Sequence, residues 1–268
     1  MPMMRQFGLS HEAAIEQFID LDYGDGSELL DAYAHSWKAH ESGRETTGFL
    51  VMRTALLNRI GAAYAKKDAR TFKATVDAFL ANTLANSKVG SPSAAFLSFD
   101  LGLAISVGQH KVAKLIAQLT LRDTNASEQP YPTALCGHVL AAFTDLDMEL
   151  AEKAAAALHS KCVAKAYGKL DCETFSSWAQ AASSLARRSP EEAIYAHLKL
   201  IANSRRRWID RELGRWLQGR NTDLSSSEFF DWPVSALAAV ADGFGYHLDQ
   251  KADAFAFSDW RWTSGKKQ

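Results

Sequence analysis

Proline and cysteine are scarce in this chain, and each scarcity narrows the range of folds. Only 6 of the 268 residues are proline and only 3 are cysteine. Proline interrupts helices, so its scarcity, together with long runs of alanine and leucine, favours helical structure. The cysteines, Cys136, Cys162 and Cys172, form no CxxC pair. So few of them, in odd number, are typical of a protein in a reducing cytosol.

Long apolar segments and an excess of one charge are also missing. No apolar run in the sequence is long enough to span a membrane, and the N-terminus lacks the apolar core of a signal peptide. The 30 basic and 31 acidic residues leave a net charge of −1, which argues against general nucleic-acid binding through a basic surface. We therefore expect a cytoplasmic protein with no membrane partner and little affinity for nucleic acid.

Motifs of common enzymes and metal sites are missing as well. The sequence contains no HExxH, no Gly-rich phosphate loop and no GxSxG. His159 and Cys162 stand three residues apart with Cys172 nearby, but no fourth zinc ligand is evident, and Cys136-Gly137-His138 is a weaker candidate still. We expect no metal, no cofactor and no enzymatic activity. An active site assembled from residues distant in sequence stays the less favoured alternative.

The sequence does contain apolar residues at helical spacing almost throughout. The clearest helix start is at Ser189, which can cap, followed by Pro190 at the first helical position and Glu192, which can close a capping box. Similar patterns predict an all-α fold of about ten or eleven helices. The expected helices cover residues 10–19, 28–40, 47–65, 68–86, 91–108, 109–121, 133–143, 147–164, 171–186, 189–216 and 234–242. The tail 245–262 is expected to form a short strand or an irregular segment.

A weak internal repeat indicates how these helices pack. A polar turn followed by an alanine-anchored helix recurs four times, at Ala74, Ala113, Ala151 and Ala193, with spacings of 38 to 42 residues. One helical hairpin cannot bury its own apolar face, so neighbouring hairpins stack and share a core. The sequence therefore predicts stacked antiparallel hairpins, in the manner of an α-solenoid such as a tetratricopeptide or HEAT array. No Gly/Ser-rich linker divides the chain, so a single domain over 1–268 is expected.

Charge is distributed unevenly near the N-terminus. Residues 7–37 contain no lysine or arginine. The simplest interpretation is a solvated helix face, and the alternative is a contact for a basic protein partner. The acidic residues of that predicted contact are Asp20, Asp22, Asp25, Glu28 and Asp31. The same stretch resembles a calcium-binding loop, but glycine at its fifth position and aspartate at its sixth disfavour calcium.

The balance reverses between residues 199 and 220, which are strongly basic. Arg207, Arg211 and Arg215 recur every four residues beside Trp208 and Trp216. A nucleic-acid clamp is one interpretation, but intervening acidic residues and the overall charge favour tryptophans in the core with arginine stems packed on them. We predict structural tryptophans and at least partly exposed arginines. The three arginines are the alternative partner-binding residues.

The C-terminal stretch FFDWPVSALAAVADGFGYHLD combines an aromatic lead-in, Pro233, an Ala/Leu helix and Gly245-Tyr246. Over residues 221–249 this resembles the immunity proteins of bacterial polymorphic-toxin systems, in particular immunity protein family 49. The resemblance implies a cytosolic, non-enzymatic protein that binds and neutralises a cognate toxin, and a homo-oligomer is compatible with it. It carries over no site residue. A helical-repeat adaptor or scaffold for another partner is the alternative function.

Overall fold

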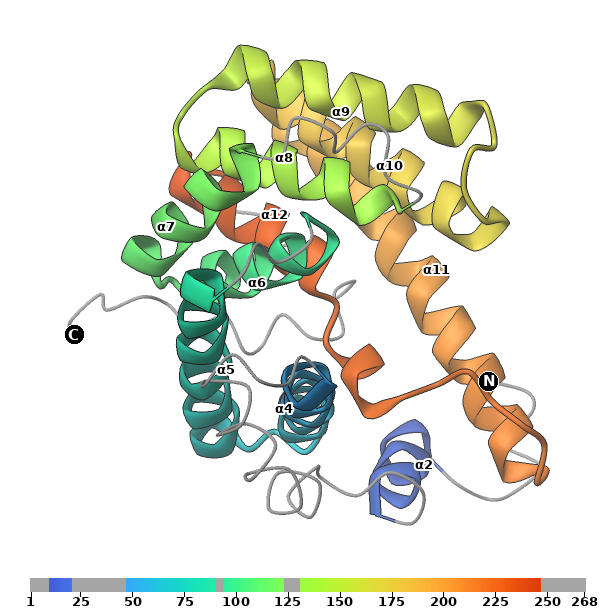
Figure 1. Cartoon of the computed structure of the whole chain (residues 1–268). Helices are drawn as coiled ribbons and strands as arrows, with labels where there is room; N and C mark the ends of the chain where they lie inside the picture. The colour runs from blue at the N-terminus through green and yellow to red at the C-terminus, as the bar shows by residue number, and fades with distance from the viewer. Residues whose placement is uncertain (1–9, 21–46, 90–93, 123–130, 247–268) are drawn as a thin grey trace. The chain divides into compact units, whose positions relative to one another are not determined.

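The computed structural model of the chain describes residues 10–20, 47–89, 94–122 and 131–246 (Figure 1). These residues form ten α-helices, one short 3-10 helix and no strand, which confirms the all-α prediction. The helix expected over 28–40 and the tail beyond residue 246 lie outside the described residues. The helices are α2 (His11–Phe18), α4 (Thr47–Ala65), α5 (Ala69–Val89), α6 (Ala94–Ser106), α7 (His110–Leu121), α8 (Pro132–Thr144), α9 (Met148–Val163), α10 (Lys169–Ala186), α11 (Glu191–Leu217), η3 (Ser226–Phe229) and α12 (Trp232–Gly243).

One type of turn joins the helices of successive hairpins. At each turn a residue with left-handed backbone follows the first helix, and the second helix begins two or three residues later. The amide of the left-handed residue donates to the carbonyl three residues back, and the following amide donates five residues back, which satisfies the free carbonyls of the helix end. The left-handed residues at these turns are Lys67, Gly108, Leu146 and Arg188, and the same turn also ends α9 at Lys165. The spacing of Lys67, Gly108, Leu146 and Arg188 follows the predicted repeat, and each of the four anchor alanines lies in the helix after one of these turns.

The chain forms two compact units, residues 1–91 with 206–230, and residues 92–205 with 231–268. One boundary falls inside the continuous helix α11. The single-domain prediction is not tested by this division and stays a prediction. We call the two groups unit 1 and unit 2 and describe each by itself.

Unit 1 has an aromatic core built from α2, α4, the second half of α11 and the segment that carries η3. The ring of Phe18 lies edge-on to Trp216, with centroids 5.3 Å apart, and to Phe229, 5.9 Å apart. The η3 backbone packs directly on α4. A Cβ at Gly61 would lie 1.8 Å from the carbonyl oxygen of Ser226, so only glycine permits this approach.

Unit 2 is organised around α8, which packs against α6, α7, α9, α10 and α12; Figure 1 shows α8 between α6 and α9. The array also departs from simple sequential stacking, because α12 returns to pack on α6. The fully buried indole of Trp178 donates to the carbonyl of Pro233 at 2.8 Å. This bond fixes the start of α12 against α10, far from its neighbours in sequence.

Candidate interaction surfaces

The second half of α11 is anchored in the core of unit 1 by one apolar stripe. Ile209 and Leu213 are buried, and Trp208 and Trp216 are partly buried and pack against the same cluster. The two tryptophans thus pack on the core, as their place in the sequence predicted. The prediction that both tryptophans are structural is confirmed.

The neighbouring stripe of α11 faces outward and carries the three arginines, which we call the basic stripe: Arg207, Arg211 and Arg215. Arg207 is exposed, and 61% of the Arg211 side chain and 43% of the Arg215 side chain are accessible. The prediction of partly exposed arginines is therefore confirmed. Because the opposite side of the helix is held in the core, the basic stripe has a fixed backbone.

A buried carboxylate, that of Glu212, binds two arginines of the basic stripe. Glu212 is only 1% exposed. It accepts hydrogen bonds from Arg211 Nε at 3.1 Å and from Arg215 Nη1 at 3.1 Å. The hydroxyl of Thr222 at 3.2 Å and the amide of Asp223 at 3.5 Å also donate to it. The two guanidinium groups are thus held in defined orientations, which lowers the entropy they lose on binding an anion.

Opposing influences set the charge state of Glu212. Burial raises the pKa of this carboxyl, whereas hydrogen bonds from Arg211, Asp223 and Thr222 and the charge of Arg215 lower it. The lowering effects prevail, so the pKa lies below its ordinary value and the carboxylate is ionised at neutral pH. In the sequence, Glu212 is only one of the acidic residues that stand between the arginines. Its burial depends on Thr222 and Asp223, and no local spacing reveals contacts that far along the chain.

Of the acidic residues predicted to meet a partner, only Asp20 lies in the described part of the chain. Its carboxylate pairs with Lys66 Nζ at 2.5 Å, and 60% of the side chain is exposed. The remaining members, at positions 22, 25, 28 and 31, lie outside the described residues, as does most of the calcium-loop candidate. The acidic contact therefore stays a prediction.

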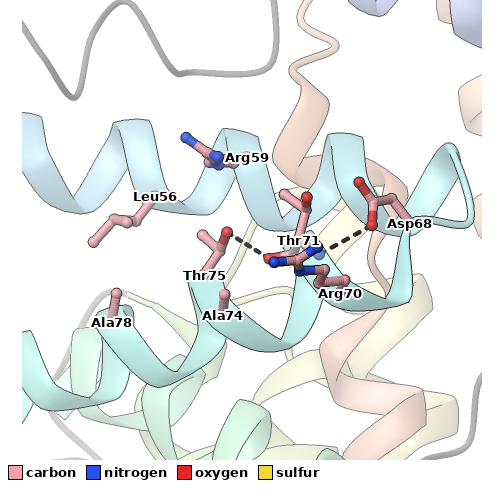
Figure 2. A pocket seen from close by; sticks show the side chains of 8 residues that line it. All are labelled: Leu56, Arg59, Asp68, Arg70, Thr71, Ala74, Thr75 and Ala78. Atoms are coloured by element: carbon pink, nitrogen blue, oxygen red, sulfur yellow. Dashed lines mark hydrogen bonds between the residues drawn. The ribbon is translucent and has the colours of Figure 1, made fainter.

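An open hollow of about 520 Å³ lies between α4 and α5 (Figure 2). Leu56 and Arg59 line it from α4, and Arg70, Ala74 and Ala78 are among its residues on α5. Small alanines on one helix opposite longer side chains on the other produce the hollow. Its two guanidinium groups give it a positive rim that could attract an acidic side chain.

The other polar groups of this hollow serve α5 itself. Asp68 caps the helix by accepting from the amide of Thr71 at 3.0 Å, which lowers the pKa of the Asp68 carboxyl. The hydroxyl of Thr75 donates to the carbonyl of Thr71 at 2.7 Å. Asp68 also adds a negative charge next to Arg70. Asp68 thus offsets part of the positive charge at the rim of the hollow.

The histidine and cysteine candidates lie in unit 2. His159 Nδ1 and the hydroxyl of Ser176 share a hydrogen bond of 3.0 Å. Burial and the nearby His159 lower the pKa of His197. Burial raises the pKa of the Cys136 thiol far above its ordinary value. Within the described ranges, no three His, Cys, Asp or Glu side chains are grouped so that they could hold a metal ion, and no described helix is long and apolar enough to cross a bilayer.

The residues that carry the family resemblance are mainly packing residues. Phe230, Trp232, Val234 and Leu237 are buried, so the stretch offers its aromatic and aliphatic side chains to the interior. No protein-family model, no curated protein and no solved structure matches this chain. The resemblance to immunity protein family 49 is not tested by these comparisons and stays a prediction.

Proposed function

We propose that this protein binds and neutralises a cognate protein toxin by covering part of the toxin's surface. The basic stripe of α11 carries the proposal. Its arginines are accessible, their helix is anchored by Ile209 and Leu213, and two of them are oriented by Glu212. Preoriented charges on a rigid helix suit recognition of another folded protein. The toxin as the partner comes from the resemblance of residues 221–249.

The basic stripe would meet a carboxylate-rich surface of the toxin. The predicted acidic contact at the N-terminus would instead meet a basic toxin surface, such as one that binds nucleic acid. Opposite charges accelerate association, and salt screens them. The two surfaces are therefore distinguished by which charge substitutions slow binding at low ionic strength.

An adaptor or scaffold function is the second candidate, favoured by the hairpin array itself. Repeated helical hairpins present extended surfaces to many kinds of protein partner. The discriminating property is growth protection, since an adaptor has no reason to rescue cells from a toxin.

The test is co-expression with the toxin domain encoded beside this chain's gene. We expect the parent chain to restore growth and to form a complex with that domain on size-exclusion chromatography. Failure of the parent chain to restore growth would reject the immunity function, and a neighbourhood without any toxin gene would favour the adaptor.

A matched pair of variants then tests the surface. Arg207→Ala with Arg211→Ala removes two exposed charges and leaves Arg215 on Glu212, and we expect association to slow at least tenfold at low salt. The control, Lys111→Ala with Lys114→Ala, removes two exposed charges from α7 and should bind normally. Reversal of Asp20, Asp22 and Asp25 to lysine tests the acidic contact. If only that reversal slows binding, the acidic contact replaces the basic stripe as the docking surface.

A further inference from the structure

Two cysteines of unit 2 lie on facing turns of a helical hairpin. Cys162 is in the last turn of α9 and Cys172 is in the first turn of α10. These two helices pack against each other and are joined by the short connection 164–168. In an antiparallel hairpin, residues a few positions before and after the connection lie opposite each other.

The contacts around the two thiols place them together. The Cys172 thiol donates to the carbonyl of Tyr167 at 3.3 Å, within the connection. Cys162 is 4% exposed, whereas Cys172 is partly exposed. Cys172 lies near enough to Cys162 to raise the pKa of its thiol, and both cysteines raise the pKa of Tyr167 in the connection between the helices. The pair is therefore an oxidisable dithiol with one accessible thiol and one covered thiol.

We propose that Cys162 and Cys172 form a redox-active dithiol, which a small disulfide such as oxidised glutathione converts to an intramolecular disulfide that ties α9 to α10. The Cys172 thiolate attacks a glutathione sulfur, which breaks the glutathione S–S bond and releases one glutathione thiolate. The Cys162 thiolate then attacks the Cys172 sulfur of the mixed disulfide and releases the second. The two protein thiols lose two electrons and two protons, and the oxidised glutathione is reduced to two glutathione molecules.

The order of the steps follows from accessibility. An incoming glutathione molecule reaches the partly exposed Cys172 and not the covered Cys162. Cys136 is fully buried in α8 and serves as an internal reference thiol. This third cysteine reports global unfolding, because only opening of the core exposes it.

The second step has a pH dependence that the structure defines. Burial, together with smaller contributions from Cys172 and Asp171, raises the pKa of Cys162 to about 12. These two residues of α10 and Tyr167 of the connection are the titratable groups that face it. Since the thiolate is the nucleophile, ring closure should accelerate roughly tenfold per pH unit below that pKa.

On α9, three residues before Cys162, His159 shares a hydrogen bond with Ser176. The helix α8, which also packs on α9, contains no Asp, Glu, Lys or Arg. The titratable residues of α8 are Cys136 and His138.

The test uses the full reduced chain incubated with oxidised glutathione at pH 7 and pH 9, quenched in acid and digested with trypsin. Cleavage after Lys165 and Lys169 separates the two cysteines, so a disulfide appears as two linked peptides. We expect this linkage at both pH values, with the glutathione adduct of Cys172 accumulating at pH 7 and closing faster at pH 9. Two of the three thiols should be lost, and Cys136 should stay reduced.

Single variants assign the roles. Cys162→Ser should stop at the glutathione adduct on Cys172, Cys172→Ser should form neither adduct nor disulfide, and Cys136→Ser should behave as the parent. The oxidised parent should melt several degrees above the reduced form, because the bond restricts the unfolded chain. Free Cys162 and Cys172 after prolonged incubation would overturn the proposal. Pairing with Cys136, linkage between chains, or adduct formation on Cys162 first would overturn it equally.

Discussion

The helices α8 and α11 differ in how much of their surface they bury. The 13 residues of α8 include none with a charge, and most of them are buried around the full circumference of the helix. The 27 residues of α11 are charged along much of their length and bury a narrow apolar stripe. The central helix of unit 2 is thus uniformly apolar, while the helix with the clearest sequence signals has a solvent face.

The difference teaches where each helix is sensitive. α8 has neighbouring helices on every side, so larger side chains on it would clash, and its packing depends on small residues. The outer face of α11 is open to solvent. The stability of this helix therefore depends on its buried aromatic rings and on the hydrogen bonds of Glu212. Substitutions in the two helices should therefore fail for different physical reasons.

Trp216→Ala in α11 should give the largest loss, about 3 kcal/mol of unfolding free energy. This value is at the low end for aromatic truncations because the ring is only partly buried, although it contacts Phe18 edge-on. Arg211→Ala, on the outer face of the same helix, should cost less than about 1 kcal/mol. Thermal or urea melts of both variants give the comparison. A Trp216→Ala protein as stable as the parent would show that the stripe does not anchor α11.

Gly137→Ala in α8 should cost about 2 kcal/mol by overpacking. A Cβ there would lie 2.2 Å from the Ser98 hydroxyl oxygen and 2.9 Å from Ser98 Cβ, so α6 and α8 would have to separate. The control is Gly243→Ala near the end of α12, where an added Cβ meets no atom within 4 Å. Urea denaturation should show the loss only for the first variant, and adding Ser98→Gly should recover part of it. Equal stability of both alanine variants would contradict close packing at α8.

Glu212→Gln should cost about 1–2 kcal/mol at neutral pH, since two guanidinium groups lose their common anion. The folded pKa of Glu212 is lowered, so its stabilisation is fully present above the ordinary glutamate pKa of about 4.3 and is lost as pH falls through the lowered value. The stability gap between parent and variant should therefore narrow from pH 7 to pH 3. Glu173→Gln, which disrupts an exposed pair with Lys169, is the control with little effect. A gap independent of pH would show that the charge of Glu212 is not what stabilises this region.

The C-terminal turns of the two helices should give the smallest effects, of opposite sign. Leu146 follows α8 with a φ of 61° and is 69% exposed, whereas Gly219 follows α11 with a φ of 68° and has open space around it. Leu146→Gly should stabilise the protein by about 0.5–1 kcal/mol, and Gly219→Ala should destabilise it by a similar amount. Calorimetric melts would measure both. Shifts of the same sign would mean that backbone strain does not govern these turns.

The spacing of apolar and charged residues along the sequence determined the helices and their faces. Helix positions, the hairpin period near Ala113 and Ala151, and the paired tryptophan and arginine stripes of α11 all follow from residues within a few turns of each other. Such patterns are readable because an amphipathic helix repeats its environment every 3.6 residues. The predicted partner contacts rested on charge alone, and charge does not specify which exposed face a partner meets.

Only the tertiary structure decided which helix is central and what Glu212 binds. A helix buried on all sides has no alternation of apolar and polar faces, so the sequence pattern of α8 is weaker than that of α11. Glu212 is buried by residues ten and eleven positions later, and the return of α12 onto α6 joins segments separated by more than a hundred residues. These contacts depend on how neighbouring helices fit together, because close packing is a property of two surfaces at once.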